Sequence, residues 1–509
     1  MVDQTQISFT MEINLPSSIL FSSATIITVN STRQIIRNGY IHIVGSRIFS
    51  VGKDSPMYPL PSNTQYHSCC GKIIIPGLIN AHAHLVQSLL RGLAEDLPLH
   101  NWLCDAVWPL EAVYAENDGY NATRLTTLEM LKTGTTCFLD PMLTHRAGFA
   151  NVCKAVGEMG IRGCLGKLVK FTETNRQLSI TDPRDKDLLD MSMDSLFQAH
   201  RAHNGQHNGR IHVWAAAGTP RGVPISAYQE LGEECSSRAV SITMHCAEAP
   251  KDLDIYRNTY GCTPMEFIEK AKMTPVKGAT SSHKLVLAHM VNLDLVKDIH
   301  LLSATGTSVA HNPTSNLKLA SGIAPVPAML SASPLPVNIA LGTDGAPCAN
   351  HYDMFQEMHL AAILHKGYNH DAAVVPAETA LEMGTINGAK ALGLENEIGS
   401  LETGKNADLV VLDPYGRGNI GISPWDWDDE AGVSPATTVV HGCTGRDVHI
   451  TMVDGQILIQ DGVLVAGGIG QEAEIVNKAK LAVKEILQRC NENRSEKVGG
   501  KLHSGWTYV

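Results

Sequence analysis

The stretch KIIIPGLINAHAHLVQSLLRG, residues Lys72 to Gly92, indicates both the fold and the kind of site in this chain. Apolar runs on either side of Pro76-Gly77 lead into His82 and His84, which are separated by one residue. Side chains at positions i and i+2 of a strand point to the same face. Both imidazoles can therefore point inward from the end of one buried strand, as two ligands of a single metal site.

The stretch begins a repeating pattern that predicts the fold. Short apolar runs alternate with segments of helical spacing such as NATRLTTLEMLKTG, residues 121–134. Strands buried on both faces that alternate with helices indicate parallel βα units, and eight of them predict an α/β fold built as a (β/α)8 TIM barrel. The predicted strands are Ile73–Asn80, Thr135–Pro141, Ile161–Lys170, Ile211–Thr219, Ser241–Glu248, Leu285–Met290, Ser308–Pro313 and Val337–Gly345. A doubly wound open sheet is the alternative, but it requires a glycine-rich phosphate turn after its first strand.

The two ends of the chain predict a second, smaller domain. β-rich runs with turn residues occupy about residues 18–75 and return at Ala407–Asp413 and Val448–Val465, where Asp454-Gly455 indicates a hairpin. We therefore expect a β-sandwich built from both terminal segments. The predicted limits are 1–75 and 396–470 for the sandwich, 76–395 for the barrel and 471–509 for a C-terminal helix, over Gln471–Asn491, with a polar tail.

Composition excludes some classes of partner. The net charge of −11 argues against nucleic acid or an anionic membrane as a partner. No apolar stretch reaches the ~18 residues of a membrane span. The 12 cysteines form no CxxC pair, which favours reduced thiols and a cytoplasmic protein.

Polar residues at the ends of the later predicted strands complete the metal site. Barrel enzymes carry their chemistry at the C-terminal strand ends. There this chain has His245 and Glu248 at the end of strand five, His289 at the end of strand six, His311 and Asn312 at the end of strand seven, and Asp344 at the end of strand eight. A single such residue is usually a packed or capping residue, but together they predict a divalent metal site. The predicted ligands are His82, His84, His245 and Asp344, with Asp344 also acting as a base.

One metal ion is favoured over two, and its identity stays open. A second ion would usually need a bridging lysine carboxylate near strand four, which has no lysine, although Lys167 and Lys170 lie on strand three. Imidazole and carboxylate suit Zn²⁺ best and also accept Fe²⁺ or Mn²⁺.

The constellation resembles the amidohydrolase superfamily over nearly the whole chain. Longer motifs are similar to the branch that holds S-adenosylhomocysteine/5-methylthioadenosine deaminases and triazine hydrolases. They are LLRGLAEDLPLHNWLCDAVWPLEA, RLTTLEMLKTGTTCFLD, NPTSNLKLASGIAPV, LGTDGAPCAN and IGSLETGKNADLVVLD.

The resemblance implies a role for each matching residue. His82, His84, His245 and Asp344 would bind one metal ion, usually zinc. His289 would lie beside the reacting water, and Glu248 would face the substrate ring and transfer protons. Glu111, in WPLEA, would hold a ribose-like or other polar part of the substrate; its alternative is a carboxylate on a helix surface.

One departure from this branch concerns the substrate. Where its nucleoside deaminases carry a histidine in a turn after strand four, this chain has AGTPRGVP with Arg221, which suits an acidic or carbonyl-rich group. Asn312 is expected to bind substrate or hold its loop. Trp102 and Trp108 could line a pocket for a flat ring, or pack in the core.

These observations predict a hydrolytic, metal-dependent deaminase (EC 3.5.4 type). It would release ammonia from an amino-substituted N-heterocycle such as S-adenosylhomocysteine, 5-methylthioadenosine or adenosine. Guanine deamination, or loss of chloride or an alkylamine from a triazine-like ring, is the alternative. A non-catalytic assembly protein is a remote alternative. Such a protein should have lost metal ligands, and all the predicted ligands are present. Similar enzymes are often homodimers or larger homo-oligomers.

Overall fold

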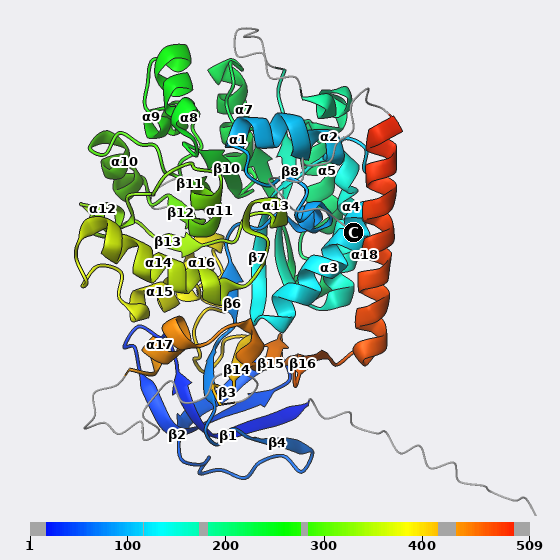
Figure 1. The fold of residues 1–509 in the computed structure, drawn as a ribbon. Helices are drawn as coiled ribbons and strands as arrows, with labels where there is room; N and C mark the ends of the chain where they lie inside the picture. Colours follow the sequence, from blue (N-terminus) through cyan, green and yellow to red (C-terminus); the bar gives the residue numbers. More distant parts are fainter. Residues whose placement is uncertain (1–16, 116, 173–181, 276–282, 416–433, 493–509) are drawn as a thin grey trace, which may run out of the picture.

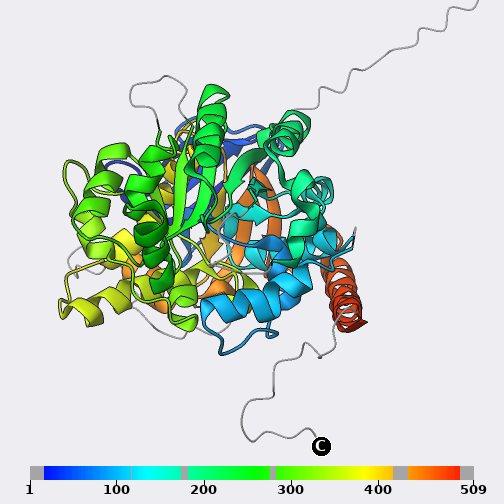
Figure 2. The same cartoon turned by 90° about the horizontal axis from the view of Figure 1, so that it is seen from above.

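The computed structural model describes residues 17–115, 117–172, 182–275, 283–415 and 434–492. Its larger part is the predicted α/β barrel, a sheet of eight parallel strands in consecutive order. Figure 2, seen from above, shows helices arranged around these strands. The strands are β6 (Leu78–Asn80), β7 (Thr135–Leu143), β8 (Arg162–Val169), β9 (Ile211–Ala217), β10 (Ile242–Cys246), β11 (Leu285–His289), β12 (Ser308–His311) and β13 (Ile339–Leu341).

The helices that follow the strands cover the outside of the barrel. Their apolar faces pack on the strands in one continuous core. The main ones are α3 (Asp118–Lys132), α4 (Phe149–Met159), α5 (Met193–His203), α7 (Ile225–Ser237), α9 (Pro264–Lys270), α10 (Lys297–Thr305), α14 (Met354–Asn369), α15 (Ala377–Met383) and α16 (Ile386–Leu392).

The first and last strands of the barrel meet through backbone hydrogen bonds. The Ala81 N–H donates to the Leu341 carbonyl (2.8 Å) and the Asp344 N–H donates to the His82 carbonyl (2.8 Å). The ends of β6 and β13 are thereby held together, so residues that follow each strand converge on one mouth of the barrel.

The prediction of one barrel strand over Ile73–Asn80 is wrong. Residues Ile73–Pro76 form β5 of the other sheet, and only β6 (Leu78–Asn80) belongs to the barrel. The break falls at Gly77, where a Cβ would lie 2.0 Å from Thr136 Oγ1. Only glycine allows so close an approach at the point where the chain passes between the two sheets.

The small β domain contains the predicted strands from both ends of the chain in one mixed nine-stranded sheet below the barrel (Figure 1). β5 lies between β1 (Ser18–Ile27) and β14 (Leu409–Leu412), so that the two terminal segments join at the centre of the sheet. The other strands are β2 (Ile35–Val44), β3 (Arg47–Lys53), β4 (Thr64–Ser68), β15 (Val448–Val453), β16 (Gln456–Gln460) and β17 (Val463–Leu464). All strands of the expected sandwich are linked in a single sheet, and apolar side chains from both segments share one core cluster.

A buried ion pair joins the barrel to this sheet. Arg162, at the start of β8, donates to both carboxylate oxygens of Asp408 at 3.2 and 3.3 Å, and the two side chains are 2% and 1% exposed. Asp408 also accepts a hydrogen bond from the Asp454 N–H (2.8 Å). Without Asp408, the buried Arg162 would keep only the longer contact with Asp454 (3.6 Å).

We therefore expect Asp408→Ala to lower the free energy of unfolding by about 3–5 kcal/mol. Urea denaturation followed by circular dichroism measures the change. Asp413→Ala is the control, because its partner Lys72 (2.9 Å) is partly exposed, and we expect a loss of at most about 1 kcal/mol. Equal losses of unfolding free energy in the two variants would contradict the stabilising role of the buried Arg162–Asp408 pair.

The C-terminal helix α18 (Gly468–Glu492) confirms the helix predicted over Gln471–Asn491 and runs along the flank of the barrel (Figure 1). Arg489 donates to the Val113 carbonyl (2.9 Å) and forms an ion pair with Asp118, so α18 is fixed beside the segment that precedes α3. Among the described residues, no helix is long and apolar enough to cross a membrane.

Candidate active site

Five polar side chains from the ends of four barrel strands converge at the mouth. One ligand atom each from His82, His245, His289 and Asp344 lies within 4.8 Å of all the others. His84 adjoins this set: its Nε2 is 3.1 Å from His245 Nε2 and 3.3 Å from Asp344 Oδ1. The residues predicted from the strand ends are therefore brought together, with His289 as close to the centre as the predicted ligands.

The protonation of His82, His245 and Asp344 fits a divalent cation, whereas the contact with Asp344 raises the pKa of His84 despite burial. Burial lowers the pKa of His82 to about 4 and that of His245 well below its usual value, so both imidazoles are neutral near pH 7. Despite burial, contacts with His82 and His84 hold the pKa of Asp344 well below its usual range. Both ring nitrogens of His82 and Nε2 of His289 are buried without a hydrogen-bond partner in the described part of the chain. Neutral imidazoles beside a carboxylate are the donor set that Zn²⁺ and similar ions bind.

The backbone around the site adopts uncommon conformations. His289 has φ +73°, Asp344 has φ +62°, and Ala247, between His245 and Glu248, has φ +51°. These left-handed conformations cost free energy in residues other than glycine and concentrate at functional sites. At Ala247 the chain turns after the end of β10, and Glu248 follows at the wall of the cavity.

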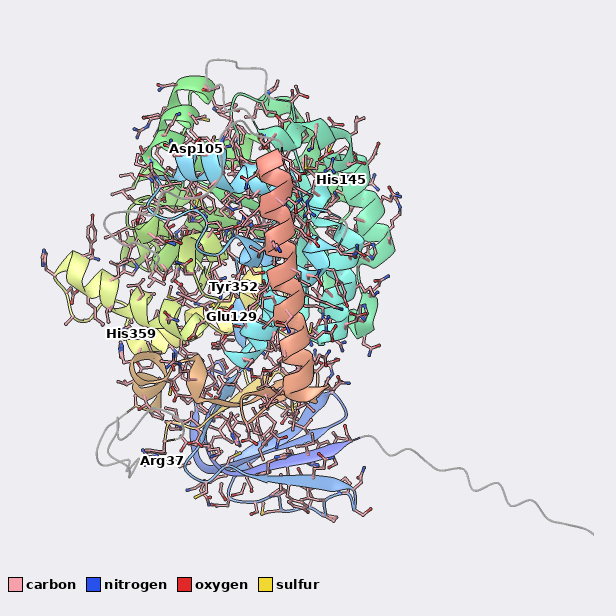
Figure 3. All side chains as sticks on the ribbon, turned by 45° about the vertical axis from the view of Figure 1, so that its right-hand side comes forward. Arg37, Asp105, Glu129, His145, Tyr352 and His359 are labelled. Carbon is pink, nitrogen blue, oxygen red and sulfur yellow. The ribbon has the colours of Figure 1, made fainter. Side chains whose placement is uncertain are left out.

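The loop that carries His82 and His84 is held from several sides. Tyr352 Oη donates to the His84 carbonyl (2.7 Å) and Asp140 Oδ2 accepts from the Leu85 N–H (2.9 Å). Tyr352 is itself fixed by its N–H, which donates to Glu129 Oε1 (3.0 Å); the two residues lie next to each other in Figure 3. The histidine pair is therefore preorganised rather than flexible.

Glu248 and His289 face each other at the edge of the site. Burial raises the pKa of Glu248 to about 7, so the carboxyl can both carry and release a proton near neutral pH. Its Oε2 is 3.8 Å from His289 Nε2, and the same nitrogen is 3.8 Å from Asp344 Oδ2.

Asn316 orients His289, a role that the sequence analysis missed. Its Oδ1 accepts from His289 Nδ1 at 2.8 Å, which fixes the ring with Nε2 toward Glu248 and Asp344. Asn316 lies in α11 (Pro313–Lys318), four residues after Asn312. Asn312 is fully buried with its Nδ2 3.4 Å from the same Nδ1, and it does not line the cavity. Its predicted contact with substrate stays a prediction.

Replacement of Asn316 by alanine tests this positioning role. We expect a 10- to 100-fold lower kcat with a smaller change in KM, because His289 loses its fixed tautomer and orientation. Asn338→Ala is the matched control: this amide binds Ser308 Oγ at the other end of the barrel (3.0 Å), and we expect a change below about threefold. Equal loss in both variants would show a general effect on folding instead.

A cavity opens directly onto the predicted metal site. It encloses about 780 Å³, including its mouth, and its walls include His84, His245, Glu248 and Asp344. Trp102 and Trp108, each 4% exposed, line it together with Arg221. They belong to the irregular helical segment formed by α1 (Leu99–Asn101), the π-helical turn Trp102–Val107 and α2 (Trp108–Glu111). Both tryptophans thus line the cavity, and their predicted contact with a flat ring stays a prediction.

Glu111 is buried behind this cavity instead of lining it. Its carboxylate accepts from Gln87 Nε2 (2.9 Å) and Arg184 Nη1 (2.7 Å), and these two donors do line the cavity. The helix-surface alternative is therefore excluded, while the predicted contact of Glu111 with substrate stays a prediction.

Asp182 and Arg184 are cavity residues that the sequence gave no reason to select. Arg184 donates to Asp182 Oδ2 (2.8 Å), and Lys170 donates to the same oxygen (2.6 Å). Lys167 donates to the Asp190 carbonyl (2.7 Å). Both lysines of strand three thus have protein partners here.

The chain is a parallel α/β barrel with histidines and a carboxylate gathered at the C-terminal ends of its strands. This arrangement is typical of metal-dependent hydrolases. The sequence model of the amidohydrolase family matches residues 73–458 of this chain. The chain belongs to the amidohydrolase family.

Similar proteins confirm the predicted branch. A 5-methylthioadenosine/S-adenosylhomocysteine deaminase of Moorella thermoacetica is 34% identical over 448 residues, covering 87% of this chain and 94% of its own. An adenosine deaminase of Xanthomonas campestris, solved with bound zinc, superposes with a TM-score of 0.77 at 26% identity and covers 93% and 99% of the two chains. Atrazine chlorohydrolase of Arthrobacter aurescens shares the fold, with a TM-score of 0.74 at 21% identity over 91% and 100%.

Proposed function

We propose that this protein is a metal-dependent deaminase that hydrolyses the amino group of adenosine-type nucleosides, such as 5-methylthioadenosine or S-adenosylhomocysteine. The observation that supports it most is the convergence of His82, His84, His245, His289 and Asp344 at one end of a cavity, with Glu248 beside them. The names of the similar proteins support the substrate class.

We assign the cation to His82, His84, His245 and Asp344, one ion per chain. A divalent cation held there lowers the pKa of water enough for hydrolysis at neutral pH. Zn²⁺ fits the donor set best, and Fe²⁺ or Mn²⁺ are accepted by the same donors.

The protein residues supply binding and proton transfer. Trp102 and Trp108 provide apolar surface for the flat ring. Asp344 and His289 orient the attacking water and take up its proton. Glu248 protonates a ring nitrogen as the water oxygen adds to the carbon that bears the amino group. The proton taken from the water then passes to the amino nitrogen, the carbon–nitrogen bond breaks and ammonia leaves, while Glu248 takes back a proton from the added hydroxyl as the carbon becomes a carbonyl.

Ammonia release from a panel of compounds tests the proposal. The purified, metal-analysed protein is assayed with adenosine, 5-methylthioadenosine, S-adenosylhomocysteine, guanine, cytosine and aminotriazines. We expect about one metal ion per chain and ammonia from an adenosine-type nucleoside. Metal without ammonia from any compound would favour another leaving group. A wild-type protein that binds no metal would contradict the site assignment.

A further inference from the structure

Arg221 differs from the other cations of the cavity because no described residue gives it an anionic partner. Lys170 and Arg184 are each bound by carboxylates. Among the residues that the structure describes, Arg221 makes no hydrogen bond and no ion pair, although it is only 8% exposed and its Nε is buried. A buried guanidinium that has left water without a partner costs free energy, which an anion in the cavity would offset.

The guanidinium of Arg221 is held against an aromatic wall. Its Cζ lies 5.1 Å from the centroid of the Trp108 ring, and Arg184 Cζ lies 4.7 Å from the same centroid. Such stacking fixes the plane of a guanidinium and leaves its N–H groups available for a ligand.

The turn that carries Arg221 is also fixed. Tyr228 Oη donates to the Gly218 carbonyl (2.9 Å) before the turn. After it, Tyr260 Oη accepts from the Gly222 N–H (3.0 Å) and donates to the Val223 carbonyl (2.9 Å). Two tyrosines thus hold both ends of the Gly218–Val223 segment, so little ordering is needed when a ligand binds.

The wall beside Arg221 presents further hydrogen-bond donors. The indole Nε1 atoms of Trp102 and Trp108 are buried without an acceptor, as is Arg221 Nε. The carboxylate of Asp182 is occupied by Arg184 and Lys170. One unpaired cation beside further donors matches a group with a single negative charge and two acceptor oxygens.

We propose that Arg221 binds a carboxylate of the substrate and thereby makes the enzyme prefer a nucleoside with an amino-acid tail, S-adenosylhomocysteine, over 5-methylthioadenosine. The inference rests on the proposed deaminase function. Both nucleosides carry the same adenine, ribose and thioether, and only the former ends in a carboxylate. The planar fork of arginine binds a carboxylate through two parallel hydrogen bonds.

The test measures the ratio of kcat/KM for S-adenosylhomocysteine to that for 5-methylthioadenosine. We expect Arg221→Gln to lower this ratio roughly 100-fold, the effect of losing a buried charge-assisted contact. Arg221→Lys keeps the charge without the fork, so an intermediate ratio is expected. Lys251→Gln is the matched control: it removes an exposed charge from α8 (Pro250–Ile255), outside the cavity wall, and we expect the ratio to stay within about twofold.

A second measurement needs no variant. The wild-type enzyme should turn over a decarboxylated analogue of S-adenosylhomocysteine with a kcat/KM roughly 100-fold below that of the parent compound. An unchanged ratio in Arg221→Gln, or equal turnover of parent and analogue, would overturn the role of Arg221 while the deaminase function stands. Wild-type protein that deaminates neither nucleoside would instead overturn the proposed function itself.

Discussion

Replacement of Glu248 by glutamine is expected to lower kcat by about 10²- to 10⁴-fold, the usual range for loss of a general acid–base group. Glutamine has nearly the same shape but cannot carry the proton that the ring nitrogen and the leaving amine need. Because Glu248 is outside the compact ligand set, we expect the metal content to stay at about one ion per chain. Steady-state ammonia release and elemental analysis on the same sample measure both quantities.

Glu357→Gln is the matched control for this experiment. Burial raises the pKa of Glu357 to about 8, so its side chain is already largely neutral at pH 7, and it is not part of the cavity wall. We expect a change in kcat below about threefold. If the two glutamine variants lost activity to the same extent, or if Glu248→Gln stayed fully active, the proton-transfer role of Glu248 would be wrong.

Loss of the metal ion is expected to abolish activity and to lower the unfolding temperature. A ligand that binds only the folded state stabilises it, so chelation should lower the melting temperature, and added Zn²⁺ should restore both properties. In His82→Ala the bound metal should fall below about a tenth of an ion per chain, because an imidazole at the centre of the set is gone. Added Zn²⁺ should then fail to restore activity.

His212→Ala is the control for the loss of an imidazole. His212 lies near the start of β9, at the end of the barrel opposite the mouth. We expect it to keep both metal and activity. Retention of a full equivalent of metal in His82→Ala would refute the ligand assignment.

Sequence alone predicted the barrel and the residues at its mouth. The C-terminal ends of all strands in a parallel barrel lie at the same end of the barrel. His82, His84, His245, His289 and Asp344 each follow a recognisable apolar run, so their convergence follows from topology. The pattern did not reveal that the first run changes sheets at Gly77, because an isoleucine run suits either sheet equally well.

The polar wall of the cavity was less predictable. Arg184 lies in an irregular segment between β8 and α5, and its pairing with Glu111 joins residues that no local pattern relates. Asn316 was visible only as one polar residue in a short helix. Such side chains gain their roles from tertiary contacts, and hydrophobic periodicity carries no record of those contacts.

The central position of β5 has a consequence for biosynthesis. A ribosome makes β1–β5 early, but β14, the hydrogen-bonding neighbour of β5, emerges about 330 residues later, which takes on the order of 20–60 s of translation. During that time the nascent chain presents the apolar strand Ile73–Pro76 with an unpaired edge, a template for aggregation. A transcript truncated before Leu409 would leave that edge permanently open, so the late strands β14–β17 complete the first domain begun.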